Sequence, residues 1–174
     1  MSAIRPDIRA GPIPRSSSPL KVVACILDSS AGAFAASVVR TALQALAHSQ
    51  LVTIERHRGA FVASPSPQEA AEIFEARSLI EPRVASLAAK NARDVDIDRL
   101  KAHVAEEHAA LAENDIGMAL ALSGQFHIAL CDIAGHKVLG AFVQSLISRS
   151  SLIIALYWRR RETACESHSH AALI

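Results

Sequence analysis

The sequence has few aromatic residues and almost no net charge. Only 4% of the 174 residues are Phe, Trp or Tyr, although 51% are hydrophobic, so alanine and leucine fill most apolar positions. Such a composition favours close-packed helices over sheets and predicts a mainly α fold. Because the net charge is +1, overall basicity does not indicate a nucleic-acid partner, and such a partner must be argued from local clusters of charge.

Cysteines and long apolar runs are also scarce. Cys25, Cys131 and Cys165 are scattered and have no CxxC spacing, which argues against a disulfide framework and a thiolate zinc site and suits a reducing compartment. The longest apolar runs, such as 151–158, are shorter than the roughly 20 residues that cross a bilayer. We therefore expect a soluble, cytoplasmic protein with no membrane partner.

Proline and serine divide the chain into segments. Residues 1–19 contain four prolines and three arginines without periodicity, which predicts disorder. The sequence SPSPQ at 64–68 separates a small domain, residues 20–64, from a larger domain, residues 68–174.

The small domain combines helical periodicity with a hairpin pattern. We expect a short helix at 20–27, a turn at 31–36 and a helix capped by Ser37. The helix is expected to turn Val39, Ala42, Leu43 and Leu46 toward a small core and Arg40, Thr41, Gln44 and His48 outward.

Residues 51–55 and 60–63 are expected to form two strands. They are joined by Arg56, His57, Arg58 and Gly59, a tip that carries two fixed positive charges. Such a tip suits DNA phosphates or a minor groove, although clustered arginines are also typical of a solvated face.

The larger domain is predicted to be a series of helices. Their expected ranges are 68–92, interrupted by Pro82 with a kink or a split at Glu81; 96–113; 116–134, ending at Gly135; 138–160; and a last helix from about Glu162. The inward positions are Ile73, Ile80, Val84, Leu87, Leu100, Val104, Leu111, Ala119, Leu120, Phe126, Leu130, Leu139, Phe142, Leu146, Ile153 and Leu156.

Four ionisable residues interrupt these apolar faces. Arg77 and Arg149 each lie between inward residues, and a buried guanidinium needs an ion-pair partner such as Glu81 or a bound anion. His127 and His170 are also placed inward, where two imidazoles bind a divalent metal or act as hydrogen-bonded core residues. His57, His103, His108, His136 and His168 are interpreted as surface residues.

An ordered series of motifs runs through most of the chain after Ser37. VRTAL, LV, RGAFV, EARSLIEP, FHIAL and AGHKVL follow one another in a series that resembles the GntR family of transcription regulators, FadR subfamily. The resemblance implies a winged helix-turn-helix followed by an all-α FCD-like bundle. It implies a homodimer that binds operator DNA and a small organic acid, and not an enzyme. The DNA-binding residues would be Ser37, Arg40, Thr41, Gln44, Arg56, His57, Arg58 and Gly59.

The same resemblance implies a ligand site inside the bundle. The effector-binding residues would be Arg77, Ser123, His127, Arg149 and His170. Family members often hold a metal through an Asp at the position of Ser123 and through histidines at His127, His170 and a fourth position. Because Ser123 replaces the carboxylate and the fourth ligand would lie beyond Ile174, we expect Zn, Ni or Mn to bind weakly or not at all.

Two alternatives follow from the residues. Ala35 and Ala36 stand where the family carries a Ser-Arg pair, and the last helix is cut off at Ile174, so the chain is alternatively a partial regulator that acts only as a helical association module. A metal-dependent enzyme is the weakest reading, since P-loop, HExxH and Ser/His/Asp patterns are absent from the sequence.

Overall fold

The computed structural model describes residues 33–157, 170–171 and 173–174. The expectations for 1–19, 20–27 and the beginning of the last helix near Glu162 lie outside the described residues. The chain divides into two compact units, and the boundary between them in the sequence lies between Ser66 and Pro67. Each unit is described by itself.

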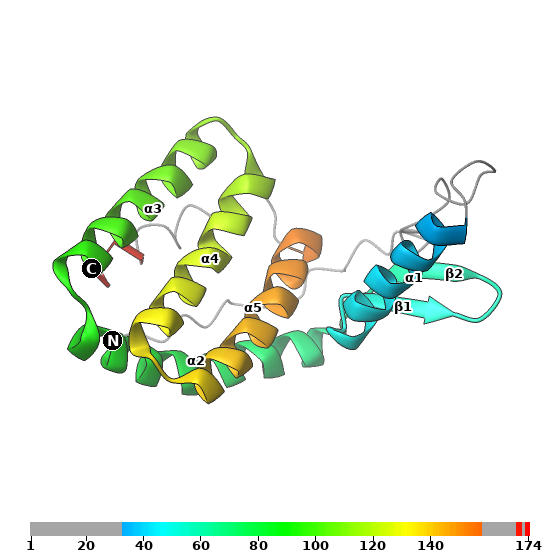
Figure 1. Cartoon of the computed structure of the whole chain (residues 1–174), viewed down its shortest axis with the longest axis horizontal. Helices are drawn as coiled ribbons and strands as arrows, with labels where there is room; N and C mark the ends of the chain where they lie inside the picture. The colour runs from blue at the N-terminus through cyan, green and yellow to red at the C-terminus, as the bar shows by residue number, and fades with distance from the viewer. Residues whose placement is uncertain (1–32, 158–169, 172) are drawn as a thin grey trace. The chain divides into compact units, whose positions relative to one another are not determined.

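The first unit is a helix followed by a two-stranded hairpin. Helix α1 (Ala33–His48) packs against β1 (Val52–Glu55), which pairs antiparallel with β2 (Gly59–Val62) (Figure 1). The register runs from Val52↔Val62 to Glu55↔Gly59. Both predicted strands are confirmed to within one residue.

The beginning of α1 differs from the expectation. The helix starts at Ala33, so residues 33–36 are not a turn and Ser37 is not the cap. The reason is that the alanine-rich start has high helix propensity. The backbone carbonyl of Ser37 accepts a hydrogen bond from Thr41 Oγ1 at 3.0 Å.

The inward face of α1 is also shifted. Val39, Leu43 and Ala47 are half-buried, whereas Ala42 and Leu46, which were expected to face a core, are exposed. Positions 39, 43 and 47 are separated by four residues and therefore form one stripe of the helix.

The second unit is a four-helix bundle. It contains α2 (Pro67–Asn91), α3 (Asp94–Ala112), α4 (Ile116–Ala134) and α5 (Lys137–Tyr157). Helix α4 contacts all three of the others, and α2 also packs against α5, so α4 is the central helix of the bundle (Figure 1). The mainly α prediction is confirmed.

Local signals set the ends of α4. Asp115 Oδ1 accepts a hydrogen bond from the Met118 backbone N–H at 2.9 Å, which satisfies a free donor of the first turn. Gly135 ends the helix in the left-handed conformation, with φ of 68°, as predicted.

Proline does not divide α2. The helix is continuous from Pro67 to Asn91 with Pro82 inside it, so of the two predicted outcomes, a kink or a split at Glu81, the split is wrong. Pro82 is exposed, so its ring lies on the solvent side, while Ile73 and Val84 on either side of it are buried in the bundle. Packing of these residues offsets the one hydrogen bond that proline removes.

The main core lies between α2, α3, α4 and α5. Phe126 and Val143 are its most buried apolar residues, with 0% and 1% exposure. The other buried members are Val84, Ala88, Leu100, Val104, Leu130, Cys131, Ala134 and Ile147. These residues come from all four helices, so the bundle has one shared core.

The buried face of α5 differs by one position from the expectation. Ile153 is buried as predicted, and Val143, Ile147, Ser150 and Ile154 are buried as well, whereas Phe142 and Leu156 are 57% and 36% exposed. The spacing of four, three and four residues defines the buried stripe, and Phe142 lies beside it.

Helices α4 and α5 are long and apolar enough to cross a membrane by length and composition alone, which the search for uninterrupted apolar runs did not reveal. The core helix of a water-soluble protein passes the same test. Because α4 packs against α2, α3 and α5, and α5 packs against α2 and α4, we interpret both as helices of the bundle.

Burial predicts a slow-reacting thiol at Cys131. Burial, and to a lesser extent the nearby carboxylates of Glu81 and Asp132, raise the pKa of this thiol from 9.0 to about 11. At pH 8 the thiolate fraction is therefore about 100-fold lower than in the unfolded chain. In a Cys25→Ser/Cys165→Ser variant, iodoacetamide should label Cys131 at least about 100-fold more slowly than in the same variant in guanidinium chloride. Equal rates would contradict the buried position.

Candidate functional site

A single arginine connects three helices inside the bundle. Arg77, from α2, donates from Nε to Glu81 Oε1 at 2.6 Å and from NH1 to Ser150 Oγ at 2.9 Å. Its NH2 lies 3.1 Å from His127 Nε2. The Arg77–Glu81 pair expected from the sequence is confirmed, and it extends to α4 and α5.

Ser150 is well suited to hold the guanidinium. Its side chain is fully buried, and its hydroxyl donates to the Ile147 carbonyl at 3.1 Å. The oxygen therefore keeps a lone pair for the N–H of Arg77.

The two predicted histidines meet beside this arginine. His127 Nε2 and His170 Nε2 are 3.2 Å apart. The His170 ring stacks on Phe126, with centroids 4.4 Å apart, and its Nδ1 lies 2.9 Å from Glu107 Oε2. Since His170 and Glu107 are 4% and 3% exposed, this contact is an internal ion pair or a strong hydrogen bond.

The hydrogen-bonding network assigns the tautomer of His127. Its Nδ1 faces Glu81 Oε2 at 3.4 Å, and its Nε2 faces an N–H donor of Arg77. Arg77 has no acceptor, so Nε2 must present a lone pair and the proton of a neutral ring belongs on Nδ1. Burial, Arg77 and His170, in that order, hold the pKa of His127 well below 6.5, so the ring is neutral at pH 7.

A proton or a metal ion must lie between the two Nε2 atoms if their contact is favourable. His170 Nδ1 faces the Glu107 carboxylate and therefore carries a proton, which leaves its Nε2 facing the lone pair on His127 Nε2. Two lone pairs 3.2 Å apart repel each other. Protonation of His170 Nε2 or a bound metal ion removes this repulsion.

The donor set only partly suits a metal. The separation of 3.2 Å between the two Nε2 atoms matches the roughly 3.3 Å between neighbouring ligands around tetrahedral zinc at about 2.05 Å. However, the described residues contain no group of three or more His, Cys, Asp or Glu side chains able to hold an ion. The Arg77 guanidinium also lies at the same nitrogen, where it would repel a cation.

Two further predicted effector residues differ in their surroundings. Ser123 is 7% exposed and lies one helical turn before His127, and its hydroxyl has no hydrogen bond to the described residues. Arg149 is half-buried on α5, but no hydrogen bond or ion pair joins it to the Arg77 cluster, because Ser150 takes the inward position of this turn. The effector-binding role expected for Arg149 therefore stays a prediction.

Two cavities lie outside the Arg77 cluster. One, of about 160 Å³, lies between α3 and α4, and a second, more open one of about 320 Å³ lies between α4 and α5. The residues of the Arg77 cluster line neither.

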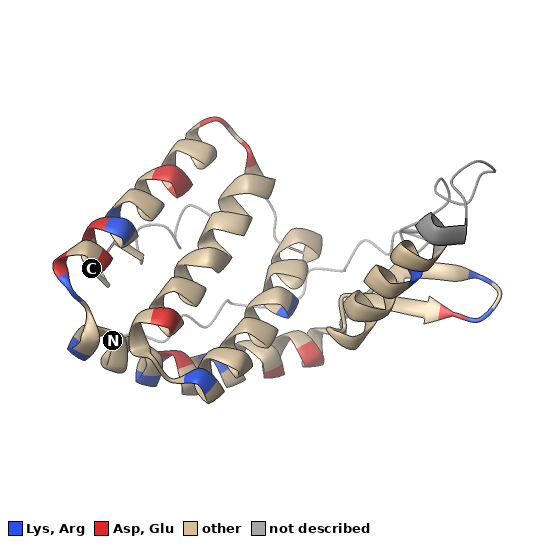
Figure 2. Ribbon diagram, in the orientation of Figure 1, with Lys and Arg blue, Asp and Glu red and all other residues tan. Residues whose placement is uncertain are grey.

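The hairpin tip carries two of the arginines of the first unit (Figure 2). The strands are joined by Arg56, His57 and Arg58, with φ of 62° at His57 and 107° at Gly59. Glycine suits the latter position because it has no Cβ. Arg58 forms an ion pair with Glu55 and lies 5.6 Å from the Phe61 ring centroid, so Arg56 is the less compensated charge of the two.

The predicted recognition residues of α1 are on its surface. Ser37, Arg40, Thr41 and Gln44 are all exposed. The Thr41 hydroxyl is used within the helix, so Arg40 and Gln44 are the side chains with the most freedom to reach a ligand.

Sequence reasoning missed several residues of the site. Glu107, Phe126 and Ser150 contribute contacts that were not expected. Glu107 follows Leu100 and Val104 at helical spacing, so its inward position was readable from the pattern. His103 was interpreted as a surface residue, but it is half-buried and its Nε2 lies 2.9 Å from the Leu122 carbonyl oxygen.

Comparison with known proteins identifies the bundle. The model of the FCD domain family matches residues 72–174, more than half of the chain. No curated protein matches.

Solved structures share the fold. Escherichia coli McbR/YncC is 18% identical, with a TM-score of 0.65 over 77% of this chain and 70% of that one. A transcriptional regulator GntR from Rhodococcus sp. RHA1 is 20% identical, with a TM-score of 0.58 over 79% and 73% of the two chains. Streptococcus agalactiae GntR is 21% identical, with a TM-score of 0.50 over 79% and 69%.

A double-mutant cycle tests the Arg77–Glu81 contact. Their side chains are 13% and 24% exposed, so Arg77→Met should cost about 2–4 kcal/mol of unfolding free energy by leaving Glu81 partly buried and unpaired. The coupling between Arg77→Met and Glu81→Gln should be about 1–3 kcal/mol in denaturant titrations. The solvent-screened Arg93–Asp96 pair is the control and should couple much more weakly. Equal coupling in both pairs would show that the interior contact has no special role.

Proposed function

The chain belongs to the FCD-domain family, whose members are transcription regulators of the GntR type and not enzymes, and we propose that it couples operator binding by its hairpin unit to binding of a small carboxylate by its bundle. The observation that carries this proposal is the convergence of Arg77, His127 and His170 inside that domain. As a regulator of bacterial type it would be soluble and act in the cytoplasm. The FadR subfamily assignment stays a prediction.

DNA binding by the first unit is supported by exposed cations and donors. Arg40 and Gln44 of α1 have the side chains that pair with guanine and adenine edges in a major groove. The hairpin tip presents Arg56 and Arg58, which are suited to phosphates or a narrow minor groove. Helix and wing would thus supply base contacts and backbone contacts respectively.

Carboxylate binding is supported by the remaining donors of Arg77. A guanidinium has five N–H groups, and Glu81, Ser150 and His127 account for three of them. A carboxylate effector would take the other two or displace Glu81. Either change alters the contacts that join α2, α4 and α5, so the effector favours one arrangement of these helices over another. If no small mono- or dicarboxylate changes operator affinity, this part of the proposal is wrong.

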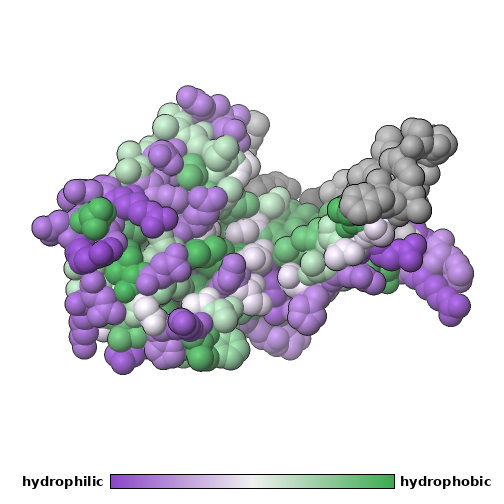
Figure 3. Space-filling view, in the orientation of Figure 1, coloured by the Kyte–Doolittle hydropathy of each residue, from purple (hydrophilic) through white to green (hydrophobic). Residues whose placement is uncertain are grey.

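A homodimer is supported by apolar side chains on the bundle surface. Leu79 of α2 and Val138 and Phe142 of α5 are 74%, 62% and 57% exposed, and Figure 3 shows hydrophobic side chains among the polar ones on the face in view. Exposed apolar groups of this size are typical of an interface, and a two-fold dimer would present two wings to a palindromic site. A monomeric mass in light scattering at tens of micromolar would contradict this part.

A second function is favoured by one observation on α1. Val38 and Leu46 are 53% and 38% exposed, so the described residues of the hairpin unit leave part of the apolar surface of α1 uncovered. In this alternative the chain is a partial regulator that acts only as a helical association module. It predicts dimeric protein with a cooperative melt of the bundle and no sequence-selective DNA binding.

DNA titrations test the wing. With a labelled duplex from the region upstream of the gene, Arg56→Gln should weaken binding and reduce the slope of log K against log salt by about 0.9. Glu55→Gln should strengthen binding, because it releases Arg58 from its ion pair. The control is Lys90→Gln, on α2 of the bundle, which should leave the slope unchanged. Absence of salt-sensitive, sequence-selective binding would rule out DNA-binding activity and favour the association module.

Any metal would be held by His127 and His170, with Ser123 as a neutral third group, and would supply a positive charge to bind the effector carboxylate. Ser123→Asp restores a carboxylate one turn before His127 and should raise the affinity for Zn, Ni or Mn by at least about tenfold in calorimetry. Ser123→Asn, of the same shape without the charge, is the control. His127→Ala should abolish binding in both backgrounds, and metal binding that survives it would place the ion elsewhere.

A further inference from the structure

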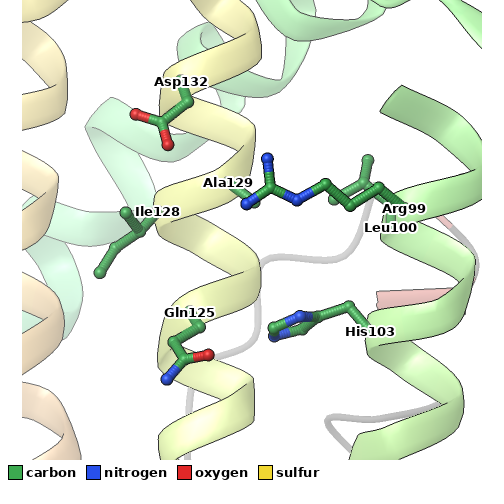
Figure 4. Close-up of a pocket in the computed structure, with 7 residues that line it drawn as sticks. All are labelled: Arg99, Leu100, His103, Gln125, Ile128, Ala129 and Asp132. Carbon is green, nitrogen blue, oxygen red and sulfur yellow. The ribbon is translucent and has the colours of Figure 1, made fainter. Parts of the chain in front are cut away.

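The cavity between α3 and α4 contains an unusual set of charges. Arg99 and His103 line it from α3, and Gln125 and Asp132 line it from α4. In Figure 4 the Arg99 guanidinium reaches across toward α4 beside Ala129, while His103 and Gln125 face each other one turn away. Spacings of four residues on α3 and of seven on α4 keep each pair on one helical face.

The two charged groups of this cavity have no partners among the described residues. Arg99 and Asp132 form no ion pair with each other or with any described side chain. Asp96 is close enough for Arg99 to lower its pKa, although Arg93 is the main cause. Arg93 donates hydrogen bonds to both carboxylate oxygens of Asp96, at 2.8 and 3.1 Å. The N–H groups of Arg99 therefore remain available to a ligand.

The neutral groups of the cavity are also suited to a ligand. His103 Nε2 lies 2.9 Å from the Leu122 carbonyl oxygen, so Nε2 donates and Nδ1 is left as the second polar atom of the ring. Gln125 is exposed and offers both a carbonyl and an amide group. Leu100, Ile128 and Ala129 supply an apolar surface.

The cavity presents a positive charge from Arg99 and a negative charge from Asp132, with an apolar surface beside them. This arrangement is complementary to a molecule that carries both charges. We propose that this cavity binds a small zwitterion of the α-amino acid class. Its carboxylate pairs with the Arg99 guanidinium, in the bidentate geometry that arginine favours. Its ammonium group pairs with the Asp132 carboxylate, and its side chain lies against Ala129 and Ile128.

The size of the cavity limits the ligand. About 160 Å³ corresponds to roughly five water molecules at about 30 Å³ each, and it is below the roughly 300–1,000 Å³ of pockets for drug-sized molecules. Glycine, alanine and serine are of suitable size, and large aromatic amino acids are not.

This site is separate from the Arg77 cluster. None of Arg77, His127 and His170 lines it, and the two sites lie on different sides of α4. A zwitterion that joins Arg99 to Asp132 would strengthen the α3–α4 contact, while the proposed effector acts on α2, α4 and α5.

Nuclear magnetic resonance titration of the full chain tests this proposal. L-Alanine should cause saturable shifts of backbone amide signals in residues 99–103 and 125–132. Propionate, which lacks the ammonium group, and ethylammonium, which lacks the carboxylate, should each bind at least about tenfold more weakly. Loss of one charge-assisted contact, worth about 1.5–3 kcal/mol, corresponds to this factor or more.

Charge-neutral variants complete the test. Arg99→Gln and Asp132→Asn should each weaken alanine binding at least about tenfold, and because both residues are exposed the variants should fold. Lys101→Gln and Asp98→Asn remove matched exposed charges of α3 outside the cavity, and they should leave the affinity unchanged. The proposal is overturned if propionate binds as well as alanine, if both cavity variants bind alanine normally, or if no saturable shift occurs up to about 100 mM.

Discussion

The helical bundle depends on how one buried guanidinium is neutralised. Arg77 lies between apolar positions of α2, and its charge would be costly there without partners. Glu81 supplies the negative charge, Ser150 a buried acceptor from α5, and His127 a ring nitrogen from α4. The hydrogen bonds of the Arg77 side chain therefore fix the positions of α2, α4 and α5 relative to one another. Apolar packing alone would fix these positions less specifically.

The same requirement determines the state of the histidine pair. Because Arg77 needs an acceptor, His127 must be neutral with its proton on Nδ1. The contact between His127 Nε2 and His170 Nε2 is then favourable if a proton or a metal ion lies between these two nitrogen atoms. His170 comes from the end of the chain and is held by Glu107 of α3 and by stacking on Phe126. The polar cluster thus joins all four helices to the C-terminal residues. A ligand that displaces any one member changes the contacts of the others, which is the property that an effector-responsive domain requires.

Helical periodicity predicted most of the bundle, because apolar residues at 3.6-residue spacing face one core. It located α2 to α5 within a few residues and placed Arg77, His127 and His170 on inward faces. It failed where neighbouring positions compete for one face. Val143 is buried in place of its larger neighbour Phe142, and Ser150, whose hydroxyl accepts from Arg77, is buried in place of its neighbour Arg149. Arg149 lies one residue away and takes no part in the cluster.

The remaining differences come from interactions that a single sequence does not display. Whether Glu107 pairs with His170 depends on the packing of α3 against the chain end, 63 residues away. The cavity between α3 and α4 depends on the separation of two helices, so His103 was indistinguishable from a surface histidine. At α1, local alanine content extended the helix past Ser37.

The protonation state of His127 tests this account most directly. Long-range ¹H–¹⁵N correlation spectra of the histidine rings at pH 7 distinguish the two neutral tautomers and the imidazolium. We predict a neutral His127 ring with its proton on Nδ1, because Nε2 accepts from Arg77. A proton on Nε2, or a doubly protonated ring, would contradict the arrangement of Arg77 on which the bundle and its proposed effector site depend.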